Sequence, residues 1–182
     1  MDFPILSSLI LLPAVGSLFI FFTKSKENAT SKYLALFVTF VNFILSLYLW
    51  YIFDSSTSDF QFVEERQWLK GIVNYKVGID GISILFIILT TFITPLCVIS
   101  VNNTVKIRLK EFLIAILLME TLMIGVFCSL DLIIFYLFFE GGLIPMFLII
   151  GIWGGERRVY SAFKFFLYPL LGSVLMLVAI LS

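Results

Sequence analysis

Apolar residues fall into six long runs along this chain of 182 residues, and polar links separate the runs. About 20 apolar residues in a row allow an α-helix to cross the hydrocarbon core of a bilayer. The pattern therefore predicts an all-α membrane protein with a single membrane domain over 1–182. Its six transmembrane helices are expected at 4–23, 33–53, 81–101, 112–129, 131–151 and 160–181.

The links between the runs differ in length. The link from Asp54 to Asp80 is the only long one. It holds two stretches rich in β-branched and aromatic residues around Lys70-Gly71, and it therefore predicts a short β-hairpin on the outer face. An amphipathic surface helix over Phe62–Leu69 is the alternative. The link at Ser129–Asp131 is so short that the fourth and fifth spans must be adjacent and antiparallel.

Composition agrees with a membrane protein and excludes several classes of function. Hydrophobic residues make up 61% of the chain and charged residues only 13%, whereas a soluble domain carries about a quarter charged residues. The 12 basic and 12 acidic side chains balance, so nucleic acid is not an expected partner. The apolar composition makes membrane lipid an expected partner. The chain has no histidine, and Cys97 and Cys128 lack metal-ligand spacing, so we expect no metal site.

Charged residues in the links orient the predicted bundle. Links one, three and five carry three acidic residues and nine basic ones, namely Lys24, Lys26, Lys32, Lys106, Arg108, Lys110, Arg157, Arg158 and Lys164. The other side carries three basic residues and seven acidic ones. Since basic residues collect in links on the cytoplasmic or matrix side, both termini are expected on the outer side.

Glu140 is the first candidate for chemistry, because it lies midway along the apolar stretch Leu130–Gly154. A charged group at the centre of a bilayer costs several kcal/mol, so such a residue usually faces protein or water and marks an ion pathway. Pro145 cannot bond the carbonyl of Gly141, which weakens the helix beside the carboxylate and favours water and proton transfer there. The alternative is a protonated Glu140 that only donates a hydrogen bond between helices.

Two further ionisable residues lie within the predicted spans. Glu120 is near the middle of span four, where it is either functional or a satisfied packing group. Because spans four and five are antiparallel, Glu120 and Glu140 are expected at similar depths, where facing carboxylates share one proton. Lys164 lies near the inner start of span six. It is either a snorkelling anchor or a buried cation that modulates Glu140.

Three segments of the chain resemble the N-terminal part of subunit 4 of respiratory NADH dehydrogenase (complex I), a member of the antiporter-like family. They are VGIDGISILFIILTTFITPLC (Val77–Cys97), FYLFFEGGLIPMFLIIGIWGG (Phe135–Gly155) and KFFLYPLLGSVLMLVAIL (Lys164–Leu181). The resemblance implies a fragment of the larger antiporter-like fold, with a hairpin in the long outer loop. One departure is Pro169, which stands where the family pattern has threonine and predicts a bend in span six or a later start.

The resemblance also implies a function. Glu140 matches the fifth-span glutamate of the family, which pairs with a lysine of the seventh span. The chain is then a proton-translocating, non-redox subunit of NADH:ubiquinone reductase, and it binds no cofactor itself. NADH, FMN, iron–sulphur clusters and ubiquinone belong to other subunits of the complex. A subunit of a cation/proton antiporter complex and a purely structural or assembly fragment are the alternatives.

The family has about fourteen spans, so further partners are implied. We expect a second chain that carries the remaining spans, and other membrane-arm subunits of complex I around both chains. A split subunit is favoured over an incomplete chain. The expected location is the mitochondrial inner membrane, with a bacterial plasma membrane as the alternative.

Overall fold

A computed structural model describes residues 4–23, 28–69, 73–105 and 107–181. Over these residues the chain forms six α-helices that are long and apolar enough to cross a membrane. The prediction of six spans is therefore confirmed. The helices are α1 (Ile5–Phe22), α2 (Asn28–Ile52), α3 (Ser83–Thr104), α4 (Leu109–Cys128), α5 (Leu132–Trp153) and α6 (Arg158–Leu181).

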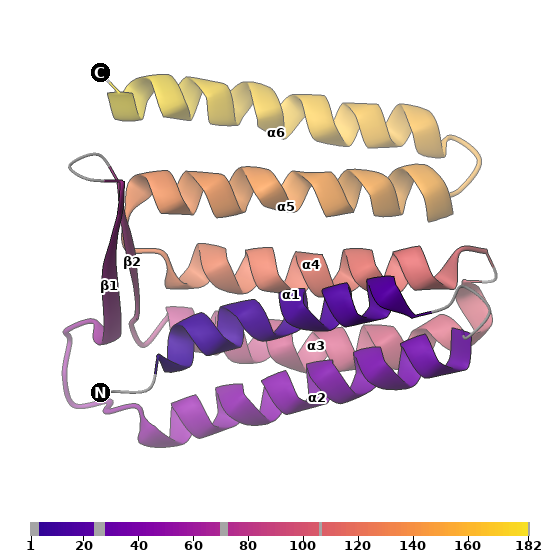
Figure 1. Ribbon diagram of the computed structural model, residues 1–182. Coiled ribbons are helices and arrows are strands. Elements are labelled where there is room, and N and C mark those ends of the chain that lie inside the picture. The colour runs from indigo at the N-terminus through magenta and orange to yellow at the C-terminus, as the bar shows by residue number, and fades with distance from the viewer. Residues whose placement is uncertain (1–3, 24–27, 70–72, 106, 182) are drawn as a thin grey trace.

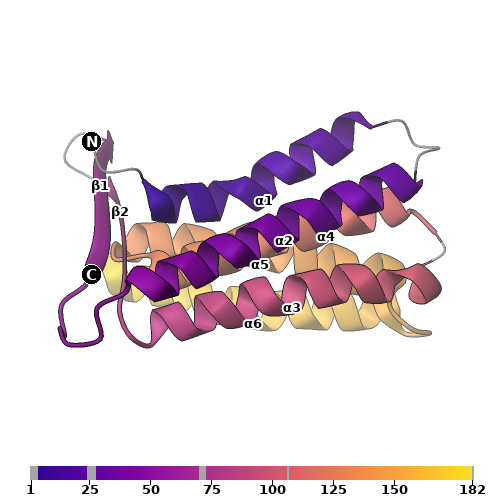
Figure 2. The same ribbon diagram turned by 90° about the horizontal axis from the view of Figure 1, so that it is seen from below.

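The helices run side by side as a bundle, with the hairpin standing across one end (Figure 1). Helix α4 lies at the centre, because it contacts α1, α2, α3 and α5. Helix α5 packs against α4, as the short link predicts, and α6 packs against the far side of α5. Seen from below, α1, α2 and α3 spread over the other side of α4 (Figure 2). The bundle is thus a four-helix unit, α1–α4, with α5 and α6 added in sequence.

The largest boundary difference is at α2, which begins at Asn28 although the apolar run predicts a start at 33. A hydropathy criterion counts only residues that suit hydrocarbon, while a helix continues through polar residues until its hydrogen bonding ends. Helix α6 begins at Arg158, two residues before its predicted start, and runs without a break past Pro169. The expectation that Pro169 makes span six start later is therefore wrong.

The long link forms a two-stranded antiparallel sheet of β1 (Gln61–Leu69) and β2 (Val73–Ile79). The β-hairpin is confirmed, and the alternative of a surface helix over Phe62–Leu69 is wrong. The register shifts between Gln61 and Glu64, where Phe62 has a positive φ of 53°, the irregularity of a β-bulge. The predicted Lys70-Gly71 turn lies outside the described residues, as do Lys24, Lys26 and Lys106 among the charges used for orientation.

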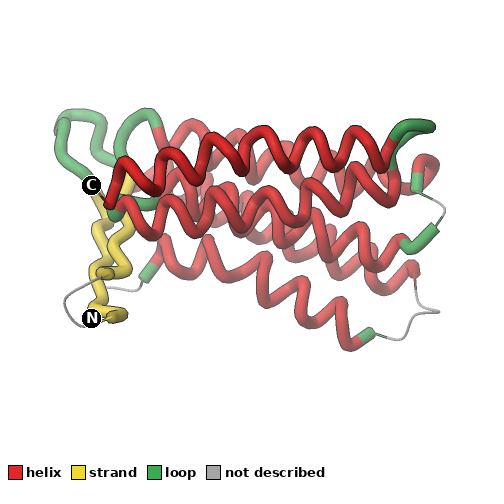
Figure 3. The backbone as a smooth tube through the Cα atoms, turned by 90° about the horizontal axis from the view of Figure 1, so that it is seen from above, coloured by secondary structure: helices red, strands yellow, loops and turns green. Residues whose placement is uncertain are grey.

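The hairpin is fixed to the bundle at two places. The carboxylate of Glu64 accepts hydrogen bonds from the backbone N–H groups of Leu6, at 2.8 Å, and Ser7, at 3.2 Å, at the start of α1. The N–H of Leu130 bonds the carbonyl of Lys76 at 3.0 Å, between α4 and α5. The start of α1 and the end of α6 lie at the same end of the bundle as the hairpin (Figure 3). The charge-based prediction also places both termini and this loop together.

Candidate functional site

Buried polar residues form a layer halfway along the α1–α4 bundle. One hydrophobic cluster, which includes Leu9, Ile87 and Ile124, fills the end next to the hairpin. A second cluster, which includes Ile20 and Val98, fills the other end. The residues between the two clusters, which we call the polar layer, are Ser17, Thr39, Asn42, Ser46, Thr91, Thr94, Glu120 and Thr121. Every one of the four helices contributes to this layer.

Glu120 is held in the polar layer by Asn42. The Asn42 side-chain amide Nδ2 donates a hydrogen bond of 2.8 Å to Glu120 Oε1. Asn42 is 0% and Glu120 2% exposed, so α1–α4 enclose the pair. The amide oxygen of Asn42, Oδ1, and the second carboxylate oxygen of Glu120, Oε2, are buried and have no partner among the described residues. The pair thus retains buried, unused hydrogen-bonding capacity beside an ionisable group.

The hydroxyls of the layer mostly bond their own helices. Thr39 donates to the carbonyl of Ala35 at 3.0 Å, and Thr91 donates to that of Ile87 at 3.0 Å. One link joins two helices, because the Ser46 and Thr91 hydroxyls lie 2.7 Å apart. These groups are neutral, so Glu120 is the one ionisable residue of the layer.

A stripe in the sequence of α2 builds one wall of this layer, and sequence reasoning missed it. Asn42 was not among the predicted site residues. The positions of α2 buried at 0–1% exposure recur every three or four residues and carry mainly small or polar side chains, namely Ser31, Ala35, Thr39, Asn42, Ser46 and Leu49. Small residues at this spacing allow helices to approach closely in a membrane. The same spacing is the signal that could have identified Asn42.

Glu140 lies on a different side of the bundle, on the face that α5 presents to α6. The ring of Phe147 packs against Phe163 of α6 at 5.4 Å between centroids. Glu140 is seven residues earlier, and 3.6 residues per turn place it on the same face. Glu140 is half-buried, and its Oε2 is buried with no partner among the described residues.

The antiparallel register of α5 and α6 places Glu140 level with Ser173. A side chain at Gly151 would meet Ala162 at 3.5 Å. Counting eleven residues back along α5 and forward along α6 pairs Glu140 with Ser173. Over 158–180 of α6, where side chains are described, Ala162 and Ser173 are the two buried residues, at 1% and 3% exposure. The carboxylate is therefore close to the middle of the bundle, next to the last helix of the chain.

The two glutamates do not form the facing pair that the sequence suggested. A side chain at Gly141 would meet Leu122, and one at Gly125 would meet Phe138, which fixes the register of α4 and α5. In this register Glu120 and Glu140 differ in depth by about three residues, roughly 4.5 Å. Their depths are similar, as predicted. However, Glu120 bonds to α2, whereas Glu140 lies on the α6 side. The expectation that they share one proton is corrected by this geometry.

Two other predicted features lie near α5 and α6. Helix α5 is continuous from Leu132 to Trp153, so the helix does not unwind at Gly141 or Pro145. Pro145 is buried in it, and a proline ring leaves the Gly141 carbonyl without its usual donor. Lys164 is exposed and lies about 200° around α6 from Ala162. It is level with 149, about 14 Å along the axis from Glu140, so the structure does not bring Lys164 and Glu140 together.

These groups define the chemistry that the site can perform. Among the described residues no group of three or more His, Cys, Asp or Glu side chains could hold a metal ion. Cys97 is exposed and Cys128 is buried, and both are free thiols. The available chemistry is therefore the gain and loss of protons at two carboxylates in the middle of a membrane-sized bundle, the buried Glu120 and the half-buried Glu140.

Comparison with known proteins gives a consistent set of relatives. NADH-quinone oxidoreductase subunit M of Rhodobacter capsulatus is 59% identical over 85% of this chain and 30% of its own length. NADH-ubiquinone oxidoreductase chain 4 of Marchantia polymorpha is 48% identical over 97% of this chain and 36% of its own length. Subunit M of Rickettsia prowazekii is 45% identical over 100% of this chain and 38% of its own length. The chain thus spans about a third of the length of these relatives.

A family comparison and a structural comparison agree with these relatives. The family described as "NADH:quinone oxidoreductase/Mrp antiporter, TM" matches residues 129–182. The fold is similar to a chain in the structure of the membrane-bound sulfane sulfur reductase, an archaeal respiratory membrane complex, with a TM-score of 0.78 and 16% identity. That similarity covers 97% of this chain and 36% of the other, and it shows the fold alone.

Proposed function

Because this chain belongs to the family of subunit M and chain 4 of the NADH:quinone oxidoreductases, we propose that it is part of a proton-translocating membrane subunit of such an oxidoreductase. In this proposal the chain couples electron transfer from NADH to quinone with proton movement across the membrane. It carries protons and no electrons. NADH, FMN, iron–sulphur clusters and ubiquinone would be bound by other subunits.

The observation that carries the proposal is the position of Glu140. Its carboxylate lies mid-span with one buried oxygen that has no partner among the described residues. An unpaired charge at this depth costs about 3 kcal/mol or more, which favours the protonated acid. A cation brought close to Glu140 favours the carboxylate instead. A conformational change that moves such a cation toward and away from Glu140 would therefore release and reload one proton.

Glu120 and Asn42 fit a second, supporting role in proton transfer. An ionised Glu120 accepts a hydrogen bond from Asn42 Nδ2, as in the described arrangement. A protonated Glu120 can donate to Asn42 Oδ1 after the amide rotates, because an amide offers both a donor and an acceptor. We assign Asn42 as a positioning residue that satisfies Glu120 in both protonation states.

Helix α6 is where we propose that the remaining spans of the subunit pack. Only 6% of the α6 span is buried in this chain, whereas 44% of the α4 span is. Its exposed face carries large apolar side chains, including Leu167, Leu171 and Leu175. Glu140 lies on the face of α5 that packs against α6, so a cation from a further span would approach it from the α6 side of the bundle. A second chain with the remaining spans, and other membrane subunits around it, would supply that cation.

Lys164 fits the role of an interfacial anchor better than that of a direct partner of Glu140. It is exposed at the basic end of the bundle and lies far from Glu140 along α6. A long basic side chain at such a place keeps its charge in the headgroup region. Its influence on Glu140 would then be a long-range electrostatic one. We place this basic end in the matrix or the cytoplasm of a mitochondrial inner or bacterial plasma membrane.

A cation/proton antiporter is the second candidate function, because the matching family description names both an oxidoreductase and an antiporter. The named relatives favour the oxidoreductase. Isolation of the chain with its native partners separates the two proposals. Flavin and iron–sulphur clusters in the isolated complex support the oxidoreductase, whereas a complex without redox groups that exchanges Na⁺ for protons supports the antiporter.

Substitution of Glu140 tests the proton-carrying role. Glu140→Gln preserves size and polarity but removes the titrating group, so it should abolish proton pumping and lower coupled quinone reduction in an assembled complex. Glu140→Asp should retain part of the activity. Glu111→Gln makes the same chemical change at an exposed position in the first turn of α4 and serves as the matched control. A Glu140→Gln complex that pumps at the unmodified proton-to-electron ratio would show that Glu140 only packs helices.

A further inference from the structure

A pocket of about 860 Å³ lies at the end of the bundle opposite the hairpin, where α4 begins and α5 ends. Its walls include Val105, Ile149 and Ile152, and two arginines, Arg108 and Arg158, also line it. No acidic residue is among the lining residues. An apolar pocket that carries two positive charges and no negative one is complementary to an amphipathic anion.

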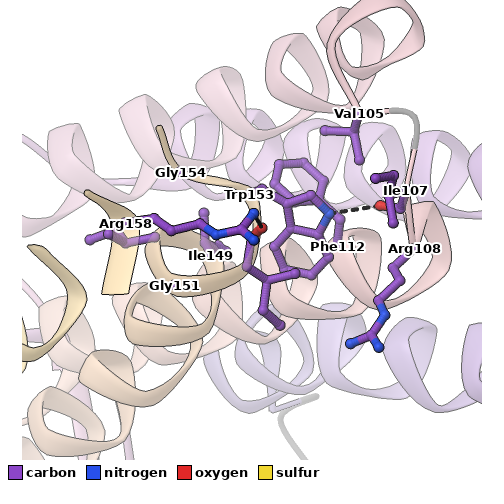
Figure 4. Close-up of a pocket in the computed structure, with 11 residues that line it drawn as sticks. Val105, Ile107, Arg108, Phe112, Ile149, Gly151, Trp153, Gly154 and Arg158 are labelled. Atoms are coloured by element: carbon purple, nitrogen blue, oxygen red, sulfur yellow. Dashed lines mark hydrogen bonds between the residues drawn. The ribbon is translucent and has the colours of Figure 1, made fainter. Parts of the chain in front are cut away.

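Aromatic residues divide the pocket at its centre. Trp153 Nε1 donates a hydrogen bond of 2.8 Å to the carbonyl of Ile107. The Trp153 ring also packs edge-on against Phe112, with 5.0 Å between the ring centroids. Figure 4 shows the guanidinium groups of Arg108 and Arg158 on either side of these rings. Tryptophan is characteristic of the headgroup region of membrane proteins, so the pocket lies at the depth of lipid phosphates.

The two arginines retain donors for a ligand. Arg158 Nη1 bonds the carbonyl of Ile152 at 2.8 Å, which uses one of its five N–H donors. Arg108 is exposed, and its side chain makes no hydrogen bond or ion pair with the residues that the structure describes. Guanidinium groups bind phosphate oxygens through paired N–H donors and lose their water more readily than ammonium groups.

We propose that this pocket binds the phosphate headgroup of an anionic glycerophospholipid. The phosphate binds the free donors of Arg108 on one side of the Trp153 and Phe112 rings, and Arg158 adds its positive charge from the other side. An acyl chain follows the apolar wall of α5 toward the exposed side chain of Leu148. Basic pockets between transmembrane helices on the cytoplasmic or matrix side bind anionic headgroups in this way. The proposal concerns lipid binding alone and does not depend on the transport chemistry of Glu140.

Photoreactive lipids test the proposal on the complete chain, purified in mild detergent with its native partners. Phosphatidylglycerol with a photoreactive acyl chain should label peptides that contain 107–112 or 149–158. The phosphatidylcholine analogue, which has no net charge, should label them several-fold less. Each arginine is expected to contribute about fivefold to binding, from roughly 1 kcal/mol per basic residue near the surface.

Matched variants separate the pocket from general surface charge. Arg108→Asn and Arg158→Gln together should reduce labelling more than tenfold, on the same scale of about fivefold per arginine. Arg66→Gln with Arg157→Gln removes two charges from residues that do not line this pocket and should leave the labelling unchanged. The single variant Arg108→Asn should still fold, because asparagine readily adopts the backbone φ of 53° found at this position.

Three results would overturn the proposal. The first is equal labelling by the charged and uncharged lipids, or by the double variant and the unmodified chain. The second is loss of labelling on addition of millimolar inorganic phosphate, which would identify a site for free phosphate. The third is labelling of another polypeptide at this position, which would show that protein fills the pocket.

Discussion

The side-chain amide of Asn42 donates a 2.8 Å hydrogen bond to the carboxylate of Glu120, between two helices and across 78 positions of the chain. The bond lies between the two hydrophobic clusters of the α1–α4 bundle. A buried carboxylate normally requires such a partner, because the loss of water is otherwise uncompensated. Asn42 therefore allows Glu120 to be buried in this layer, because its amide can donate to the ionised acid and accept from the protonated one.

Replacement of Asn42 should destabilise the bundle more than other changes in the polar layer. Asn42→Leu leaves Glu120 Oε1 without a donor, and an unsatisfied buried polar group costs about 1–3 kcal/mol. The thermal unfolding midpoint of the purified assembly should fall by several degrees. Thr39→Val is the matched control, because the Thr39 hydroxyl bonds only carbonyls of its own helix. Equal midpoints for the two variants would mean that the Asn42–Glu120 bond contributes little to stability.

Glu120→Gln should separate the structural role of Glu120 from its role in proton transfer. The glutamine carbonyl can still accept the bond from Asn42, so the thermal midpoint should stay the same or rise. If Glu120 carries protons, the variant should pump more slowly and the pH dependence of its rate should change. Proton uptake by sealed vesicles between pH 6 and 9 measures this. An unchanged rate and pH profile would assign Glu120 to packing alone.

The six helices were predictable because each depends on its own composition. Hydropathy over about 20 residues does not depend on how a helix is rotated or on what it contacts. The hairpin was predictable for a similar reason, since β-branched and aromatic residues flank its turn. The start of α2 at Asn28 was less predictable, because polar residues extend a helix beyond the hydrocarbon region.

The contacts of the site were not predictable in the same way. Glu140 and Glu120 stand out in the sequence because they are charges in apolar runs. Their neighbours depend on how each helix is rotated about its axis. A rotation of about 100°, the step from one residue to the next, turns a side chain toward another partner. The prediction that the two carboxylates face each other used only the antiparallel order of α4 and α5. Asn42 was overlooked because it carries no charge, and the search for candidates rested on the cost of placing an ionised group in the membrane.

The link between the hairpin and α1 should make Glu64 important for stability. Its carboxylate accepts from the N–H groups of Leu6 and Ser7, in the manner of a helix cap. Loss of a capping group costs about 0.5–2 kcal/mol, so Glu64→Ala should lower the thermal midpoint and speed cleavage of the hairpin by protease. Glu65→Ala is the neighbouring control, because its ion pair with Lys76 is half-exposed and of small value. Similar effects of both changes would argue against the cap.

The start of α3 should loosen at acid pH. The pKa of Asp80 is lowered from its ordinary value of 3.8 by hydrogen bonds from the backbone and side chain of Ser83. Because the folded pKa lies below the unfolded one, this stabilisation is complete above about pH 4 and is lost as the pH falls through the folded value. Amide exchange at 82–85 should therefore gain an extra acid-dependent increase. Asp80→Asn keeps a capping side chain without the charge and should remove that increase.

The orientation of the bundle can be tested with a single introduced thiol. The basic links lie at the end opposite the hairpin, and we expect that end to face the cytoplasm or the matrix. Arg157→Cys in a Cys97→Ser background places one accessible thiol there, because Cys97 is exposed and Cys128 is buried. A membrane-impermeant maleimide should not label sealed right-side-out vesicles until detergent opens them. Asp59→Cys, in the exposed link between α2 and β1, should be labelled at once. The reverse labelling pattern would place both termini on the inner side and refute the charge-based orientation.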